Sequence, residues 1–388
     1  MEPRAGESAT SLRELALLFG RLGATAFGGP AAHIAMMQDE VVSRRQWLTE
    51  ERFLDLLGAT NLIPGPNSTE MAIHIGWDRR RWPGLVVAGL AFILPAMLIT
   101  LMCGWAYVRF GSLPAASWLL YGVKPVILGV VVQAIWGLAP KAARTTLLRA
   151  LGVLAAVLSG LGVNEFAVLF GAGVAAVGAS RFRGSWKSGA GGLHQLTPLV
   201  PIGTGAVGIS AVTLPGIFGV FFKVGALLFG SGYVLLAFLR ADLVQRLGWL
   251  TESQLIDAIA VGQVTPGPVF TTATFIGYVL AGPSGALVAT AGIFLPAFIF
   301  VALSGPLVPK LRASTTAAAF LDGVNVASLA LMVVVTLQLG RAALIDAPTV
   351  ALACLGAVLL VRFKLNATWL VIGGAVAGWA IHASGLGG

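Results

Sequence analysis

The sequence predicts an all-α polytopic membrane protein, organised as an inverted-topology repeat of two homologous halves. We expect about 12–13 transmembrane helices, with a helix broken at a Pro-Gly-Pro in each half. Three observations carry this prediction: the composition, an internal repeat and the placement of charged residues in the loops.

The composition excludes a protein that faces water on all sides. The 388 residues are 57% hydrophobic and 11% charged, whereas a soluble domain has about 25% charged residues. Apolar runs of about 20 residues recur and strand-like alternation is absent, so the spans are expected to be helices and not a barrel. The net charge of +9 is spread through short loops, which argues against nucleic acid as a partner.

An internal repeat divides the chain. WLTEERFLDLLGATNLIPGP at 47–66 aligns without gaps on WLTESQLIDAIAVGQVTPGP at 249–268, with eight identities in twenty positions. The same offset of 202 positions pairs Arg21 with Lys223 and Glu40 with Asp242. After a one-residue gap, FILPA at 92–96 matches IFLPA at 293–297. We therefore divide the chain into an N-terminal transport repeat, a linker with a candidate extra transmembrane helix and a C-terminal transport repeat: 1–180, 181–216 and 217–388.

Each repeat contains six apolar segments. In the first they lie near 12–37, 53–76, 83–108, 115–137, 147–163 and 165–180. In the second they lie near 217–239, 254–280, 284–304, 317–339, 347–361 and 366–385.

Loop charges orient the two halves oppositely. Lys and Arg concentrate after segments two, four and six of the first half, but after segments three and five of the second. Because basic loops stay in the cytoplasm, equivalent loops face opposite sides. Such an inversion needs an odd number of crossings, which 199–216 would supply, with the N-terminus cytoplasmic. Arg44 and Arg45 fit this arrangement poorly. Segment two could instead be a re-entrant hairpin that turns at its PGP.

The broken helices predict an anion site. A break leaves free backbone N–H groups and the positive dipole end at the start of the following half-helix, and both attract anions. Unsatisfied backbone at membrane depth must be buried in protein or line a wet cavity. The alternative is a pair of proline kinks that serve helix packing alone. The candidate binding residues at the two breaks are Asn61, Pro64, Gly65, Pro66, Asn67, Ser68, Gln263, Thr265, Pro266, Gly267, Pro268 and Thr271.

A second repeated element is FGGP at 27–30 and FGSG at 229–232. Small residues let helices approach closely, and they also let a ligand reach backbone N–H groups. We include Gly28, Gly29, Gly230 and Ser231 among the candidates for binding. Arg21 and Lys223, just before these elements, would counter an anion's charge, unless they snorkel to the surface.

Five titratable residues are candidates for proton coupling. His33 and His74 lie near the predicted site and have no equivalent in the other half; the alternative for each is a structural histidine. The matched pair Asp55 and Asp257 precedes the breaks, and Glu70 follows the first one. Helix capping or loop salt bridges are the alternative for the carboxylates.

The sequence offers no sign of an enzyme, a cofactor or a metal site. It contains neither a GxxxxGK[ST] loop nor an HExxH motif, and no Ser-His-Asp arrangement stands out. The two cysteines, Cys103 and Cys354, stand singly in apolar runs.

The motif set resembles the chromate transporter (CHR) family in its long, two-domain form. The resemblance rests on FGGP, WLTEERFLDLLGATNLIPGP, FGSGYVLL, WLTESQLIDAIAVGQVTPGPVFTTATFIGY and GIFLPAF, and it covers essentially the whole chain. It implies a multi-pass carrier of the inner membrane that exports chromate and confers chromate resistance. Two alternatives remain: a carrier of sulfate or another oxyanion, and an oligomeric anion channel. The expected partners are the oxyanion, the lipid bilayer and a candidate second copy in a homodimer.

Overall fold

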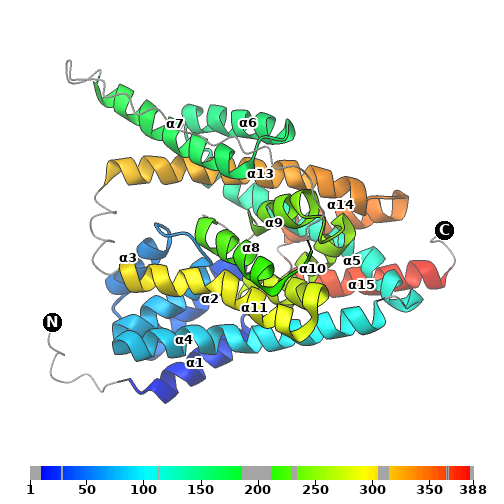
Figure 1. Ribbon diagram of the computed structural model, residues 1–388, viewed down its shortest axis with the longest axis horizontal. Coiled ribbons are helices and arrows are strands. Elements are labelled where there is room, and N and C mark those ends of the chain that lie inside the picture. Colours follow the sequence, from blue (N-terminus) through cyan, green and yellow to red (C-terminus); the bar gives the residue numbers. More distant parts are fainter. Residues whose placement is uncertain are drawn as a thin grey trace.

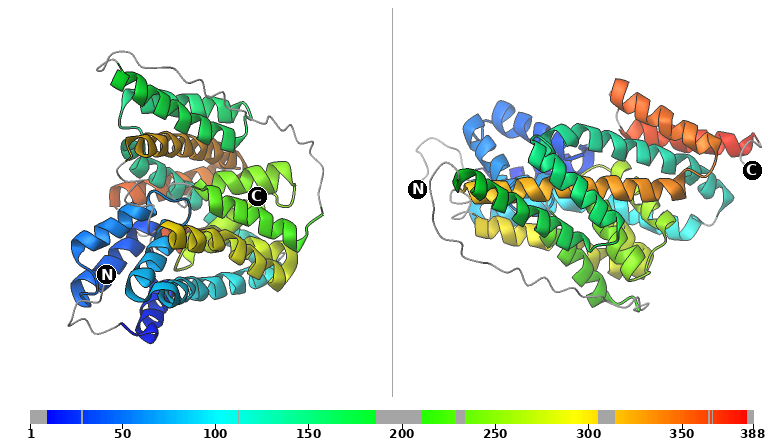
Figure 2. Two further views of the ribbon diagram at one scale, coloured as in Figure 1. Left: turned by 60° about the vertical axis from the view of Figure 1, so that its left-hand side comes forward. Right: turned by 90° about the horizontal axis from the view of Figure 1, so that it is seen from above.

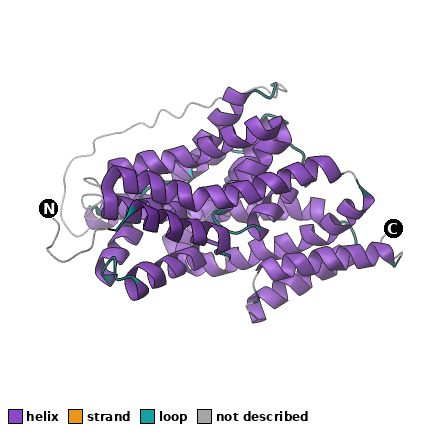
Figure 3. Ribbon diagram, turned by 90° about the horizontal axis from the view of Figure 1, so that it is seen from below, coloured by secondary structure: helices purple, strands orange, loops and turns teal. Residues whose placement is uncertain are grey.

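The structure is a bundle of long and short helices (Figures 1 and 3). It is a computed structural model that describes residues 10–27, 29–111, 113–185, 211–228, 234–304, 314–363, 365 and 367–384. Within these ranges every regular element is helical, as the composition predicts. Of the candidate extra span at 199–216, residues 199–210 lie outside the described residues.

The two halves contain the same succession of helices. The first comprises α1 (Leu12–Thr25), α2 (Gly29–Gln38), α3 (Glu50–Thr60), α4 (Asn67–Phe110), α5 (Pro114–Ala142), α6 (Thr146–Gly160) and α7 (Glu165–Ser185). The second comprises α8 (Leu214–Leu227), α9 (Leu235–Leu239), α10 (Glu252–Val264), α11 (Thr272–Ser304), α13 (Thr315–Ala343), α14 (Ala347–Phe363) and α15 (Ala367–Ala383). Equivalent π-helical stretches follow α2 and α9, at Asp39–Arg44 and Arg240–Arg246.

The repeated WLTE motif starts the helix before each break. Thr49 caps α3 by accepting a hydrogen bond from the backbone N–H of Arg52. Its equivalent Thr251 caps α10, where Gln254 returns a bond to complete a capping box. A capping side chain satisfies N–H groups that the helix leaves free.

The PGP breaks are confirmed in both halves. α3 ends at Thr60 and α4 begins at Asn67, with Gly65 at φ +138° between them. In the second half α10 ends at Val264, and a 3-10 turn at Val269–Thr271 leads into α11. Gly267 has φ +83°, in the left-handed region that favours glycine.

The first broken segment turns back at its PGP. Arg52, near the start of α3, bonds Asp78 with an Nη2–Oδ1 distance of 2.6 Å. The neighbouring Arg79 donates to the backbone carbonyl of Trp47 at 2.9 Å. Both ends of the segment therefore lie on one side of the bundle, and the PGP forms the tip of a hairpin. This decides between the two arrangements that the sequence leaves open.

Each long helix after a break is itself sharply bent. Non-helical backbone at Arg80 and Arg81 divides α4, and Ala281 and Gly282 divide α11 in the same way. Four helices are long and apolar enough to cross a membrane, among the described residues: Asn67–Phe110, Ser117–Ala142, Val269–Ser304 and Thr315–Ala343. The other apolar helices are shorter, so the count of 12–13 spans stays a prediction.

The lipid-facing side of α4 follows from its spacing. Leu90, Leu94, Leu98 and Met102 recur every four residues and are 43–59% exposed, so they form one apolar stripe along the helix. A stripe of this kind on a long apolar helix faces lipid.

The halves meet through two reciprocal hydrogen bonds. The backbone N–H of Gly65 donates to Leu228 O at 2.8 Å, and that of Gly267 donates to Ala26 O at 2.9 Å. Gly65 and Gly267 are equivalent positions of the repeat, and so are Ala26 and Leu228. Each bond is therefore the other with the two halves exchanged, as a two-fold relation between repeats requires. Figure 1 shows the long arms of α4 and α11 crossing the molecule in opposite chain directions, as an inverted repeat requires.

The later helices are exchanged between halves. α5 packs against α14 and α15 of the second half, and α13 packs against α6 and α7 of the first; the views of Figure 2 show the same layers. Gly122 of α5 packs directly on the backbone of Gly374 and Gly378 of α15, as small residues allow in membrane helices. The two sequence repeats are therefore interlaced.

Replacing Gly267 by alanine should destabilise the fold. A Cβ there would lie 2.6 Å from Ala96 Cβ and 2.7 Å from Gly23 O, at a positive φ. Gly282→Ala is the matched control, because its φ is +63° but no atom lies within 4 Å of the added Cβ. We expect a larger fall in thermal midpoint, measured in detergent, for Gly267→Ala than for Gly282→Ala. Equal falls would contradict the close packing of the tip.

Candidate functional site

A cavity of about 660 Å³ lies where the hairpin tips meet α5 and α13. The tips of both halves contribute to it, and so do residues from the two exchanged helices. The lining residues are Pro30, Ile34, Asn61, Ile63, Pro66, Asn67, Ser68, Gln133, Ala134, Gly137, Leu138, Lys141, Ala142, Val234, Pro268, Val269, Phe270, Asn325, Ser328, Leu329 and Met332.

The polar part of this lining suits an anion. It consists of four amide side chains, two hydroxyl groups and the ammonium group of Lys141, and no acidic residue lines the cavity among the described ones. Amides and hydroxyls donate hydrogen bonds to anionic oxygens, and a nearby carboxylate would repel them.

The first PGP tip brings a helix start to the cavity. Asn67 and Ser68 are the first residues of α4, and both line the cavity. The next two N–H groups, of Thr69 and Glu70, donate to Pro66 O at 2.8 and 3.0 Å. Asn67 Nδ2 donates to Asn61 Oδ1 at 3.0 Å, which holds both amides across the break. The start of α4 therefore directs its positive dipole end toward the cavity.

The second tip contributes less polar surface. Pro268 lines the cavity together with Val269 and Phe270, which replace Asn67 and Ser68 of the first half. Thr271 is buried and donates to Pro268 O at 2.9 Å, and Thr265 donates to Val261 O at 2.9 Å. Both hydroxyl groups stabilise the backbone of the break in this way, and their binding role stays a prediction.

The predicted counter-charges lie elsewhere. Arg21 pairs with Glu40 at 2.5 Å, and Lys223 pairs with Asp242 at 2.5 Å. Neither cation lines the cavity. Each carboxylate is almost buried and sits on the π-helical stretch of its own half. The matched cations therefore complete matched ion pairs away from the cavity lining, and their role toward an anion stays a prediction.

The small-residue elements are described only in part. Gly29 begins α2 at φ +79°, and the next residue, Pro30, lines the cavity. Gly28, Gly230 and Ser231, which the sequence also nominates, lie outside the described residues.

Three of the proton-coupling candidates are buried behind the first tip. Glu70 is 0% exposed, and neither carboxylate oxygen has a hydrogen-bond partner among the described residues. Its side chain packs against Gly65, where a Cβ would lie 2.3 Å from Oε1. His74, one turn further along α4, is 5% exposed, and His33 is 2% exposed with Nε2 3.0 Å from Ala26 O.

The matched aspartates have different surroundings. Asp257 is buried, accepts a hydrogen bond from Tyr107 at 2.9 Å and lies 3.4 Å from Lys124 Nζ. Asp55, its equivalent, is half-buried on α3. The repeat is therefore symmetric in sequence at this position but not in structure.

The structure adds four residues that sequence reasoning missed. Gln133 and Lys141 project from α5, and Asn325 and Ser328 from α13. Lys141 follows the fourth apolar segment, 115–137, and so counts among the loop charges in the sequence, but α5 continues to Ala142. A polar residue inside an apolar helix is a signal for a site, and it could have identified the other three.

In the described part of the chain, no three His, Cys, Asp or Glu side chains lie close enough together to hold a metal ion. Cys103 and Cys354 are free thiols.

Comparison with known proteins agrees with the repeat and with the motifs. The family model described as Chromate transporter matches residues 13–177 and again 216–379. A chromate transport protein of Cupriavidus metallidurans is 36% identical over 368 residues, covering 94% of this chain and 92% of its own. A probable chromate transport protein of Synechococcus elongatus is 32% identical, with 88% of each chain covered. A chromate transport protein of Pseudomonas aeruginosa is 30% identical, covering 96% of this chain and 92% of its own. No solved structure gives a significant match.

Lys141→Gln should weaken binding of a divalent oxyanion. Its ammonium group is the one cation of the described cavity lining, so its removal takes away the main electrostatic attraction there. We expect affinity for sulfate or chromate, measured by titration calorimetry, to fall by about three- to tenfold. Arg341→Gln, an exposed basic residue near the end of α13, is the control. An unchanged affinity in Lys141→Gln would place the anion elsewhere.

Proposed function

Because the chain belongs to the chromate transporter family, we propose that it carries chromate out of the cytoplasm by alternating access and thereby confers chromate resistance. The observation that supports this best is the cavity at the hairpin tips, which combines a helix start, amides, hydroxyls and Lys141 without an acidic side chain. Such a lining fits a tetrahedral dianion. Sulfate has the same charge and shape, and is the competing cargo.

The charge distribution supports export. Lys141 lies at the end of α5, next to Arg144 in the following loop and Arg149 in the first turns of α6. Because basic loops mark the cytoplasmic side, we place this end of the cavity in the cytoplasm and the protein in the inner membrane. The cavity then loads its anion from inside the cell.

The membrane potential is sufficient to drive this export. Moving charge across the membrane is worth about 2.3 kcal/mol per elementary charge per 100 mV. A dianion leaving a negative interior therefore gains about 4.6 kcal/mol, which corresponds to a concentration ratio of about 2,000. Uptake of the same anion would have to work against this gradient.

A proton site at Glu70 would add a second driving force. The carboxyl group is fully buried and unpartnered among the described residues, and it packs on the glycine whose N–H joins the halves. His74 and His33 are the other buried titratable groups of this region. A buried ionisable group at membrane depth is costly to keep and marks a functional position. We assign Glu70 to proton binding during the cycle.

Flux should follow the sign of the membrane potential. In proteoliposomes we expect chromate to leave the negative compartment faster, and to accumulate on the positive side, when a potassium diffusion potential is imposed. Parallel assays with radiolabelled sulfate identify the preferred cargo. Saturation and counterflow are expected of a carrier, whereas large single-channel currents would indicate a channel. Chromate flux that ignores the potential would contradict electrogenic export.

Glu70→Gln should remove the dependence of flux on pH. The amide has nearly the shape of the carboxyl but cannot exchange a proton, so the cycle would lose its coupling step while anion binding is retained. The measurement is chromate flux at a fixed potential across a series of pH values. Glu51→Gln, an exposed carboxylate on α3, is the control and should keep the wild-type pH profile. A Glu70→Gln profile that matches wild type would exclude this residue as the coupling group.

A further inference from the structure

A second, much smaller void lies beside the cavity. It measures about 10 Å³ and is lined by Val131, Leu235, Leu236, Ile259, Gln263, Val269 and Thr272. A site needs about 10–15 Å³ to hold even one water molecule, so an oxyanion cannot enter. Val269 lines both spaces, which places the void directly next to the cavity.

Part of the void lining is equivalent to the cavity lining under the repeat. Gln263 and Leu236 correspond to Asn61 and Ile34 of the cavity, and Val131 corresponds to Met332. In an inverted repeat, a path on one side of the site has an equivalent path on the other side. We call the cavity of about 660 Å³ the open path and the void of about 10 Å³ the closed path.

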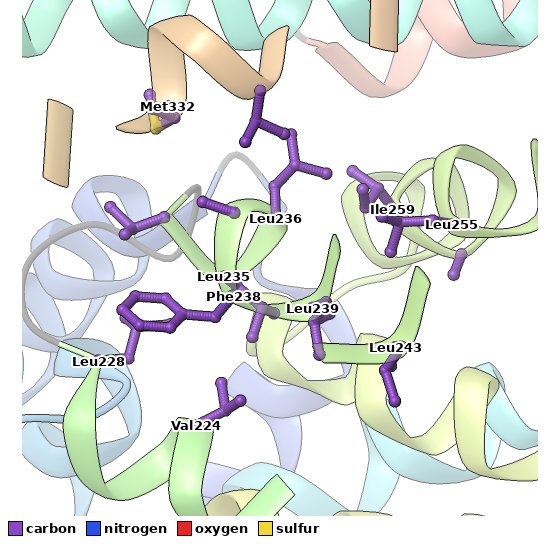
Figure 4. Close-up of a cluster of buried hydrophobic side chains, with 14 of the residues drawn as sticks. Val224, Leu228, Leu235, Leu236, Phe238, Leu239, Leu243, Leu255, Ile259 and Met332 are labelled. Carbon is purple, nitrogen blue, oxygen red and sulfur yellow. The ribbon is translucent and has the colours of Figure 1, made fainter. Parts of the chain in front are cut away.

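Apolar packing fills the closed path. Leu235, Leu236 and Ile259 belong to the large buried cluster that also includes Met332. Figure 4 shows these side chains on α9, α10 and α13. Such packing is non-directional. An additional interaction is therefore needed to favour this arrangement over the one in which the void side is open and the cavity side is closed.

A polar cluster lies on the far side of this packing. Along α5, Lys124 belongs to this cluster, Val131 lines the void, and Gln133 and Lys141 line the cavity. The void therefore lies between the cluster and the cavity. Lys124 Nζ lies 3.4 Å from Asp257 Oδ1 and donates to Ser253 at 2.6 Å. Tyr107 of α4 donates to Asp257 Oδ2 at 2.9 Å. Three helices, α4, α5 and α10, are thereby tied together beyond the void.

The open path differs from the closed one at the position equivalent to Lys124. The position equivalent to Lys124 is Asn325, which lines the open cavity and carries no charge. The lysine that lies beside Asp257 therefore has no lysine counterpart on α13.

We propose that the 10 Å³ void is the closed outer half of the transport path, and that Asp257, Lys124 and Tyr107 form the latch that closes it. Breaking the latch frees α10 to move away from α5, and the two halves then exchange conformations. The latch rests on the alternating access proposed above, since it sets which of the two paths is open.

The test measures access to both paths at once. Single cysteines replace Gln263 in the void and Asn61 in the cavity, in a chain with Cys103→Ala and Cys354→Ala. The purified protein in detergent is labelled with the anionic reagent 2-sulfonatoethyl methanethiosulfonate. With the latch intact, the cysteine at 61 should react faster than the one at 263, by about a hundredfold.

Asp257→Asn should change the two rates in opposite directions. We expect the ratio of labelling at 263 to labelling at 61 to rise about tenfold. Lys124→Gln should have the same effect, and Tyr107→Phe should have a smaller one. Tyr107→Phe tests the latch if the charge variants do not fold. The exchanged pair Asp257→Lys with Lys124→Asp should restore slow labelling at 263. Asp346→Asn is the control, because it breaks a Tyr121–Asp346 contact between the same helix and the second half.

Two results would overturn the latch. Rates that rise together would show loosened packing, and an unchanged ratio would show that another interaction keeps the path closed. The labelling contains no chromate, so either result leaves the transport proposal intact. Conversely, absence of chromate flux in proteoliposomes would refute the cargo without changing the labelling ratio.

Discussion

The architecture depends on two backbone hydrogen bonds, Gly65 to Leu228 and Gly267 to Ala26. Each joins a PGP tip of one half to the end of the first helix of the other half. A backbone N–H at membrane depth must find a partner within the protein, and for these two glycines the partner lies in the opposite repeat. The tips therefore cannot be completed by either half alone, and the site forms where the halves meet.

The same contact explains why glycine and proline surround the site. Proline removes a donor and stops the helix, while glycine accepts the positive φ and leaves room for the opposite backbone. The broken ends are free to meet an anion because ordinary helix bonding no longer uses them. The helices α5 and α13, each packed against the other half, then enclose the tips. Because of this exchange, a motion at one tip would displace helices of both repeats.

Pseudo-symmetry sets up two paths, and departures from it select one. The tip residues Asn67 and Ser68 correspond to Val269 and Phe270, so the polar face belongs mainly to the first half. Lys124 corresponds to Asn325, so the ion pair with Asp257 exists on the closed side. A transporter made of two identical halves would have no preferred resting side. Such differences give one state a lower free energy.

The sequence by itself determined the membrane class, the duplication, the breaks at the PGP motifs and the family, because composition, repetition and proline chemistry are local properties. Of the binding candidates that it nominated, Asn61, Pro66, Asn67, Ser68 and Pro268 line the cavity. Only the tertiary structure decided that the first break turns back, that Arg21 and Lys223 pair with Glu40 and Asp242, and that Lys141, Gln133, Asn325 and Ser328 reach the cavity. The physical reason is that a charge acts through whatever lies within a few ångströms of it, and which residues those are depends on how distant helices pack.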